Sequence, residues 1–167
     1  MSFEDLNQVN FKSGFIALIG RPNVGKSTFI NKFVGEKIAI TSPIAQTTRN
    51  RLKVILTNKK SQIIFVDTPG IHKPHHLLGE RLVQSAKRSI GEVDAVLVIF
   101  DANHSPGKGD AFIVNLIKNL QIPVIVALNK WDLVKLTQFK ERKREYLDFF
   151  EGSNWPVFCC SALTGEG

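Results

Sequence analysis

A glycine-containing segment at residues 20–27 stands between an apolar run and a stretch with helical periodicity, and it constrains the fold more than any other feature. Residues 15–19 are apolar throughout, which is typical of a strand covered on both faces. In residues 26–34 large apolar side chains recur four positions apart, as on one face of a helix. Because Gly20 and Gly25 permit tight turns, the sequence predicts a strand–loop–helix unit and an α/β fold.

The loop of this unit matches the phosphate-binding pattern G-x-x-x-x-G-K-[ST] at every fixed position. Free amides at a helix start, together with the helix dipole, favour phosphate. We expect Lys26 to reach the β- and γ-phosphates of a nucleotide and the Ser27 hydroxyl to bind Mg²⁺. The alternative is a glycine-rich turn with a chance Lys-Ser pair, which the flanking strand and helix disfavour. The nucleotide-binding residues expected in this loop are Asn23, Val24, Gly25, Lys26, Ser27 and Thr28.

Two further segments are placed to respond to a γ-phosphate. Asp67 ends the apolar run 63–66, so its carboxylate would hold Mg²⁺ through the water shell of the ion. Gly70 has no side chain to keep its amide from the γ-phosphate. Thr48, with Thr47 in reserve, would complete the magnesium shell only with triphosphate bound, and its release would signal hydrolysis. The alternatives are an ordinary strand-ending turn and solvated loop threonines.

The sequence Asn129-Lys-Trp-Asp132 follows another apolar run and contains what is needed to recognise guanine. Asp132 can accept from the ring N–H and the exocyclic amine of guanine, a pair of donors that adenine lacks. We expect Asn129 to tie this loop to the phosphate loop, and the Lys130 stem to lie along the purine face. The tripeptide Ser161-Ala162-Leu163 would supply a backbone amide to the guanine oxygen. A surface Lys-Asp pair is the alternative, but all the segments together predict a site for GTP or GDP.

Longer stretches around these segments carry a resemblance to a known family. They are Gly20-Arg-Pro-Asn-Val-Gly-Lys-Ser-Thr28, Ser42-Pro-Ile-Ala-Gln-Thr-Thr-Arg-Asn-Arg51 and Asp67-Thr-Pro-Gly-Ile-His-Lys-Pro74. On these residues the chain resembles the Era-type GTPases of the translation-factor class. Der-type GTPases share the phosphate loop, whereas the residues 45–49 and 71–74 look more like the Era type. The resemblance implies a GTPase domain at residues 13–167, after a flexible lead-in at residues 1–12.

The resemblance also implies partners and a location. Era-type proteins carry a C-terminal KH domain that binds RNA near the end of small-subunit ribosomal RNA, and they act in ribosome assembly. We therefore expect this chain to be the GTPase domain alone, without the KH domain through which 16S-type rRNA and the 30S-type subunit would be bound. We also expect a cytoplasmic monomer, with peripheral association at the inner face of the cell membrane as a further expectation.

Two residues bear on hydrolysis. The resemblance makes Asn23 similar to an asparagine that holds K⁺ in potassium-stimulated relatives, and stabilisation of its own turn is an equally good explanation. Ile71 follows Gly70, where Ras-type enzymes have a glutamine that orients the attacking water. Because Ile71 offers no hydrogen bond, we expect slow unassisted hydrolysis. The residues expected to act in catalysis are Lys26, Thr48, Gly70 and Asn23.

Apolar runs alternate with amphipathic stretches along the whole chain. Residues 51–57 instead alternate between apolar and polar, which suits an antiparallel edge strand paired through the turn at 58–60. We expect a P-loop NTPase three-layer sandwich: an α/β fold with a mostly parallel six-stranded sheet, one antiparallel edge strand, and ligand loops at the strand C-termini. The other predicted strands are 15–19, 63–66, 95–100, 124–128 and 157–160, and the predicted helices lie in 26–34, 78–90, 110–120 and 139–150.

Composition fits one domain with an anionic partner. At 43% hydrophobic residues the chain can bury a sizeable core, and its start has no secretory signal pattern. The adjacent Cys159 and Cys160 indicate core packing in a reducing compartment. The net charge of +7 favours rRNA, acidic lipid or the nucleotide without choosing among them. We expect residues 140–145 to be mostly a solvated face, with direct RNA contact as the alternative, and His72, His75 and His76 to be solvated.

Two other functions remain open on the sequence alone. In one, the nucleotide is a structural ligand of an RNA or membrane adaptor, and turnover is incidental. In the other, the chain is a Der-type half-domain that is followed by a second phosphate loop.

Overall fold

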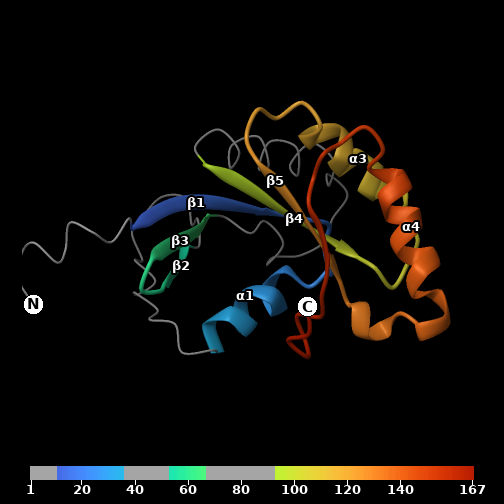
Figure 1. Ribbon diagram of the computed structural model, residues 1–167, viewed down its shortest axis with the longest axis horizontal. Coiled ribbons are helices and arrows are strands. Elements are labelled where there is room, and N and C mark those ends of the chain that lie inside the picture. The colour runs from blue at the N-terminus through green and yellow to red at the C-terminus, as the bar shows by residue number, and fades with distance from the viewer. Residues whose placement is uncertain (1–10, 36–52, 67–92) are drawn as a thin grey trace, which may run out of the picture.

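The computed structural model of the protein describes residues 11–35, 53–66 and 93–167. In these residues a six-stranded sheet has the order β2-β3-β1-β4-β5-β6, with helices on both faces (Figure 1). All neighbouring strands are parallel except β2 and β3, which are antiparallel at one edge. The predicted fold class is therefore confirmed. The strands are β1 (Lys12–Ile19), β2 (Lys53–Thr57), β3 (Ser61–Val66), β4 (Ala95–Asp101), β5 (Val124–Asn129) and β6 (Val157–Cys159).

The central strands bury side chains on both faces, which explains their continuous apolar character. Leu18 and Ile99 pack with Ile30 of α1 in one cluster. Their neighbours along the strands, such as Val98 and Phe100, pack in a second cluster with residues of α3 and α4. Figure 1 shows α1 on one side of the sheet and α3 and α4 on the other. The helices are α1 (Lys26–Gly35), α3 (Lys108–Ile117) and α4 (Phe139–Phe149), with short 3₁₀ turns η2 (Trp131–Leu133) and η3 (Leu136–Gln138).

The hairpin of β2 and β3 forms as its sequence predicts. The Asn58 side-chain oxygen accepts hydrogen bonds from the amides of Lys60 and Ser61, at 2.8 and 2.7 Å. An asparagine that bonds the backbone in this way stabilises a tight turn. Val54 and Leu56 then face the same core cluster as α1, as their alternation requires.

Helix α3 differs from its prediction in both extent and exposure. The helix predicted at residues 110–120 is α3, which begins at Lys108 and ends at Ile117. It starts earlier because the Asp110 carboxylate accepts from the Gly107 amide, at 2.9 Å, and caps the first turn. Ile113 and Ile117 of this helix are buried, whereas Phe112 is 42% exposed.

The strand predicted at 157–160 is present as β6, but the burial on both faces that its apolar run suggested is wrong. β6 ends at Cys159 and lies at the sheet edge, where its middle residue Phe158 is 58% exposed. Cys159 and Cys160 are free and partly buried, and each packs against a different core cluster. These contacts confirm a packing role for both cysteines. Burial also raises the pKa of the Cys160 thiol to about 11.

Helix α4 confirms the expected division between a packed and a solvated face. Phe139, Tyr146 and Phe150 pack in the core cluster beneath the helix. Most of the charged run at 140–145 is exposed. Arg142 is an exception, since its guanidinium donates to the Ala102 carbonyl at 3.2 Å and lies 3.1 Å from Glu145. In the described ranges, no helix combines the length and apolar character needed to span a membrane.

Candidate nucleotide-binding site

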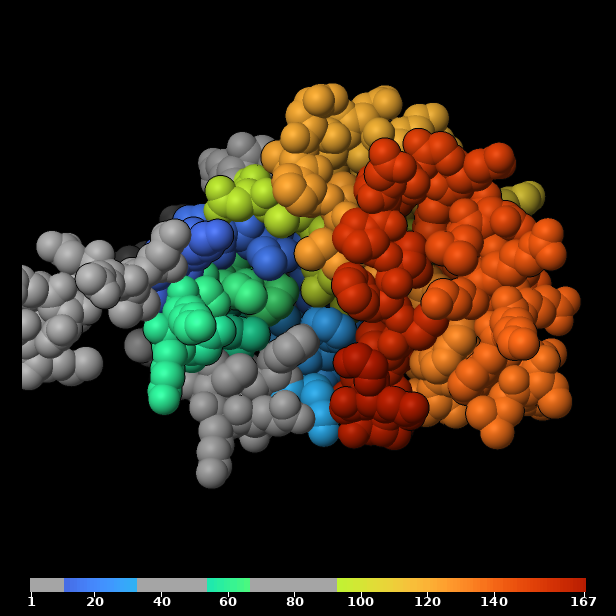
Figure 2. All heavy atoms as spheres, in the orientation of Figure 1, coloured from blue at the N-terminus to red at the C-terminus, as the bar shows by residue number. Residues whose placement is uncertain are grey.

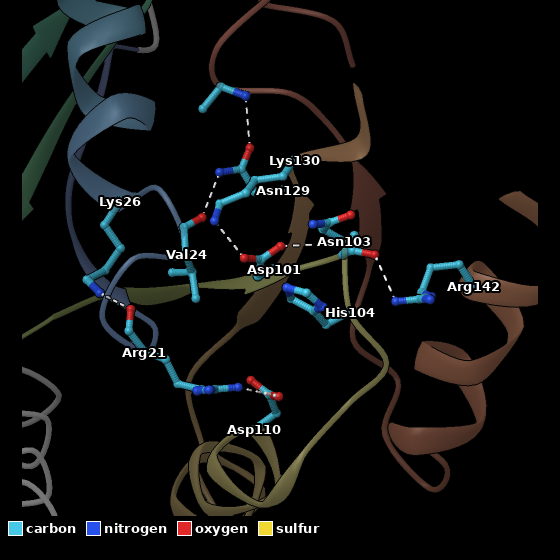
Figure 3. A network of polar contacts seen from close by, with 12 residues as sticks. Arg21, Val24, Lys26, Asp101, Asn103, His104, Asp110, Asn129, Lys130 and Arg142 are labelled. Atoms are coloured by element: carbon cyan, nitrogen blue, oxygen red, sulfur yellow. Dashed lines mark hydrogen bonds and ion pairs between the residues drawn. The ribbon is translucent and has the colours of Figure 1, made fainter. Parts of the chain in front are cut away.

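The predicted ligand loops gather at one edge of the sheet, where the parallel strands end. β1 leads into the loop before α1, and β5 leads into the segment that begins η2. The residues after β6 complete the group (Figure 3 shows the first two loops together). In an open α/β sheet this edge is where ligands bind.

Neighbouring atoms lie so close to the glycines of the phosphate loop that a side chain would not fit at Gly20 or Gly25. A Cβ on Gly20 would lie 2.6 Å from the Ile99 carbonyl oxygen and 2.9 Å from the Val24 side chain. Gly25 has a φ of 97°, and Asn23 a φ of 65°. Among the described residues, the amides of residues 23–28 find no acceptor. The loop and the start of α1 therefore present unused N–H groups, as an anion site requires.

Lys26 closes the loop on itself. The residue is only 5% exposed, and its ammonium donates to the Gly20 and Arg21 carbonyl oxygens at 2.7 and 2.6 Å. Burial lowers the pKa of Lys26 to about 8, because desolvation disfavours the charged form. A buried ammonium beside unused amides provides positive charge for a phosphate.

One buried side chain joins three loops. Asn129 is 2% exposed, and its Nδ2 donates to the Val24 carbonyl at 2.8 Å. Its Oδ1 accepts from the Ala162 amide, also at 2.8 Å. The expected tie between Asn129 and the phosphate loop is thus present, and it reaches the last loop as well. Figure 2 shows that C-terminal segment against α1, and a Cβ on Gly165 would strike the Lys32 side chain.

Two of the three backbone amides in the tripeptide at 161–163 already have acceptors within the protein. The Ala162 amide is already bonded to Asn129, and the Ser161 amide donates to the Glu166 carbonyl at 2.8 Å. In the described ranges the Leu163 amide donates to nothing. An amide for the guanine oxygen would therefore come from Leu163, or from Ala162 shared with Asn129.

The base-recognition loop exposes its carboxylate and restrains its lysine. Asp132 lies exposed in η2, and its carboxylate has no partner among the residues that the structure describes. Lys130 has a φ of 62°, and its ammonium lies 2.6 Å from a carboxylate oxygen of Asp101. The Trp131 and Phe139 rings pack in a tilted arrangement that anchors the turn, with ring centroids 5.1 Å apart and an interplanar angle of 45°.

The remaining predicted residues lie outside the described part of the chain. These are Thr47, Thr48, Asp67, Gly70 and Ile71, with the three loop histidines. Their roles stay predictions, as do those of Ser27 and Thr28, which lie exposed at the start of α1. Ser27 offers the hydroxyl oxygen that a hard cation such as Mg²⁺ accepts. Elsewhere in the described ranges, no group of three His, Cys, Asp or Glu side chains could hold a metal.

Two ion pairs around the loops were missed by sequence reasoning. Arg21 of the phosphate loop lies 3.0 Å from Asp110 of α3, whose side chain is 4% exposed. Asp101, at the tip of β4, pairs with Lys130. Asp101 is an acid that ends an apolar run, as Asp67 does, and this pattern could have drawn attention to it.

Comparison with known proteins agrees with this site. The family model described as 50S ribosome-binding GTPase matches residues 15–130. Two curated relatives, both named GTPase Era, are 57% identical (Rippkaea orientalis) and 54% identical (Crocosphaera subtropica) over 157 residues. Each match covers 94% of this chain and 50% of the relative. The chain thus spans about half the length of the curated relatives it matches.

A solved structure of Era in complex with MgGDPNP and nucleotides 1506–1542 of 16S ribosomal RNA has a TM-score of 0.73 to this chain. It is 38% identical, and the match covers 93% of this chain and 53% of that one. Since the family model covers more than half of the chain, membership is established. The chain belongs to the 50S ribosome-binding GTPase family, and it is similar to the Era GTPases.

Proposed function

We propose that the protein binds GTP and GDP and hydrolyses GTP as a Mg²⁺-dependent molecular switch. The observation that carries the proposal is the Asn129 side chain, which bonds to both Val24 and Ala162 at 2.8 Å. A single buried amide group sets the distance between the phosphate loop and the base-recognition loop. Membership of a GTPase family supports hydrolysis as the reaction.

Each end of the nucleotide would meet a different kind of group. The phosphates would lie against the unused amides of residues 23–28, with the Lys26 ammonium adding positive charge. Bound Mg²⁺ would neutralise charge on the phosphate oxygens, and Ser27, Thr48 and Asp67 are the residues to hold it. At the other end, Asp132 has a carboxylate without a partner in the described part of the chain.

The Asp132→Asn variant tests this assignment through base selectivity. The asparagine amide can donate to the xanthine oxygen that replaces the guanine amine, so we expect weaker GTP binding and stronger xanthosine triphosphate binding. The ratio of the two affinities should change by about a hundredfold, since each charge-assisted hydrogen bond is worth about 1.5–3 kcal/mol. Titration calorimetry with Mg²⁺ measures both affinities. Unchanged GTP affinity would remove Asp132 from base recognition.

We also propose that unassisted hydrolysis is slow and stimulated by K⁺. Ile71 offers no hydrogen bond to water, and Asn23 is exposed in the phosphate loop with its side chain unbonded to the other described residues. Single-turnover hydrolysis in KCl should exceed that in NaCl at equal ionic strength, by at least tenfold if the ion takes the place of an arginine finger. The Asn23→Ala variant should lose the difference. Equal rates in the two salts would leave Asn23 with a turn-stabilising role.

In the cell, we propose a role in small ribosomal subunit assembly. The support is the resemblance to Era, one solved structure of which contains a 16S ribosomal RNA segment. Residues 36–51 and 70–80 would report the nucleotide state to partners, and a KH domain of the kind that Era-type proteins carry would bind the RNA. A cytoplasmic monomer with peripheral attachment to the inner face of the cell membrane completes the proposal.

A further inference from the structure

The Asp101 carboxylate at the tip of β4 is held in place from several sides. One oxygen accepts from the Asn103 amide at 3.1 Å, and the other lies 2.6 Å from the Lys130 ammonium (Figure 3). The Asp101 carbonyl accepts from the Tyr146 hydroxyl at 2.9 Å. Tyr146 is 1% exposed and belongs to the core. Hydrogen bonds therefore join the strand tip, the core tyrosine and the carboxylate into one unit.

This hydrogen-bonded unit lies directly beside the base-recognition loop. Asp101 is the register partner of Asn129, and the Ala102 amide donates to the Asn129 carbonyl at 2.9 Å. Lys130, the next residue, has a left-handed backbone conformation that is uncommon for residues other than glycine. The flexible Lys130 side chain contacts Asp101 through its ammonium. Both side chains are mostly shielded from solvent: that of Lys130 is 29% exposed and that of Asp101 is 20% exposed. Such a partly shielded pair restrains a side chain better than an exposed one does.

We propose that Asp101 is a positioning residue for guanine recognition. By holding the Lys130 ammonium, it fixes the turn from which Asp132 projects two residues later, before any nucleotide arrives. A loop that is already ordered loses less conformational entropy on binding, so its complex dissociates more slowly. This inference rests on the proposed GTPase function. Asp101 itself touches neither the base nor the phosphates in this role.

The Asp101→Asn variant removes the charge with little change in shape. The asparagine oxygen can still accept from the Asn103 amide. Its NH₂ group would face the Lys130 ammonium, and because both groups are donors no hydrogen bond can form between them. We expect a fluorescent GDP analogue to dissociate about tenfold faster, since a hydrogen bond to a charged group is lost. The single-turnover rate with saturating GTP should stay within twofold, because the phosphate loop is untouched.

A second variant shows whether Asp101 acts through Lys130. Lys130→Met keeps a stem of similar length without the ammonium, so Asp101→Asn should add less than a twofold change in that background. Asp148→Asn is the matched control, because its pair with Arg144 is exposed, at 71% and 83%, and 3.7 Å long. It should leave GDP dissociation unchanged. If the Asp101→Asn variant does not fold, the Asp101→Ser variant is used in its place, because the serine hydroxyl can still accept from the Asn103 amide.

Dissociation at the wild-type rate, or a full tenfold effect in the Lys130→Met background, would overturn the inference. In either case wild-type preference for guanine over adenine nucleotides would show that the proposed function still holds. Absence of that preference in the wild-type protein would instead defeat the proposed function, and the inference with it.

Discussion

Replacing Lys26 by methionine is expected to weaken GDP binding by about a hundredfold or more, because each charge-assisted hydrogen bond to a phosphate is worth about 1.5–3 kcal/mol. Methionine is the suitable replacement because it fills the volume of the stem in a site where the lysine is 5% exposed. Titration calorimetry with GDP and Mg²⁺ gives the affinity. Binding within threefold of the wild type would contradict a phosphate-binding role for this ammonium.

The role of Lys26 can also be tested through the pH dependence of stability and of GDP affinity. Burial lowers the pKa of Lys26 to about 8 from 10.5 in the unfolded chain. Between these two values the unfolded state binds more protons, so the free energy of unfolding of the nucleotide-free protein should rise with pH. Phosphate, in contrast, needs the protonated ammonium, so GDP affinity should fall by about tenfold between pH 7 and pH 9.

The Lys26→Met variant is the control for both pH profiles. It has no titrating group at this position, so any slope that it retains belongs to the base or to other residues. The difference between the wild-type and variant profiles isolates the lysine. Parallel profiles in urea unfolding and in GDP titration would show that the folded-state pKa of Lys26 lies outside this pH window.

The sequence was sufficient to predict the elements whose cause is local. The strand–loop–helix unit before and after Gly25 follows from apolar periodicity and glycine positions. The Asn58 turn follows from a side chain that bonds its own backbone. Asn129 could be assigned to the phosphate loop only through a motif, because Val24 lies 105 residues earlier in the chain.

Features that depend on neighbouring strands could not be predicted in the same way. The Asp101–Lys130 pair requires β4 to lie beside β5 in a register that sets Asp101 opposite Asn129. The Arg21–Asp110 pair spans 89 residues and requires α3 to begin near the phosphate loop. The exposure of Phe158 reflects the position of β6 at the edge of the sheet, which an apolar run alone does not reveal.

Replacing Gly25 by alanine is expected to lower the free energy of unfolding by about 2–5 kcal/mol. This figure adds the strain of a left-handed backbone at alanine to the loss of two hydrogen bonds. Gly25 has a φ of 97°, a conformation that an alanine adopts only with strain. Its added Cβ would also strike the Nδ2 atom of Asn129, the atom that bonds Val24. The Asn129 side chain would have to leave Val24 and Ala162, so the phosphate and base loops would separate.

Gly152→Ala separates these two causes. Gly152 has a similar φ of 82°, is exposed, and has no atom within 4 Å of the added Cβ. The Gly152→Ala variant should lose only the free energy of the backbone strain, about 1–2 kcal/mol of unfolding stability. Its nucleotide affinity should be unchanged. Urea unfolding and GDP titration of both variants therefore distinguish strain from the loss of Asn129. If Gly25→Ala behaved like Gly152→Ala in both measurements, the Asn129 bridge would contribute nothing to the site, and the coupling of the three loops would need another origin.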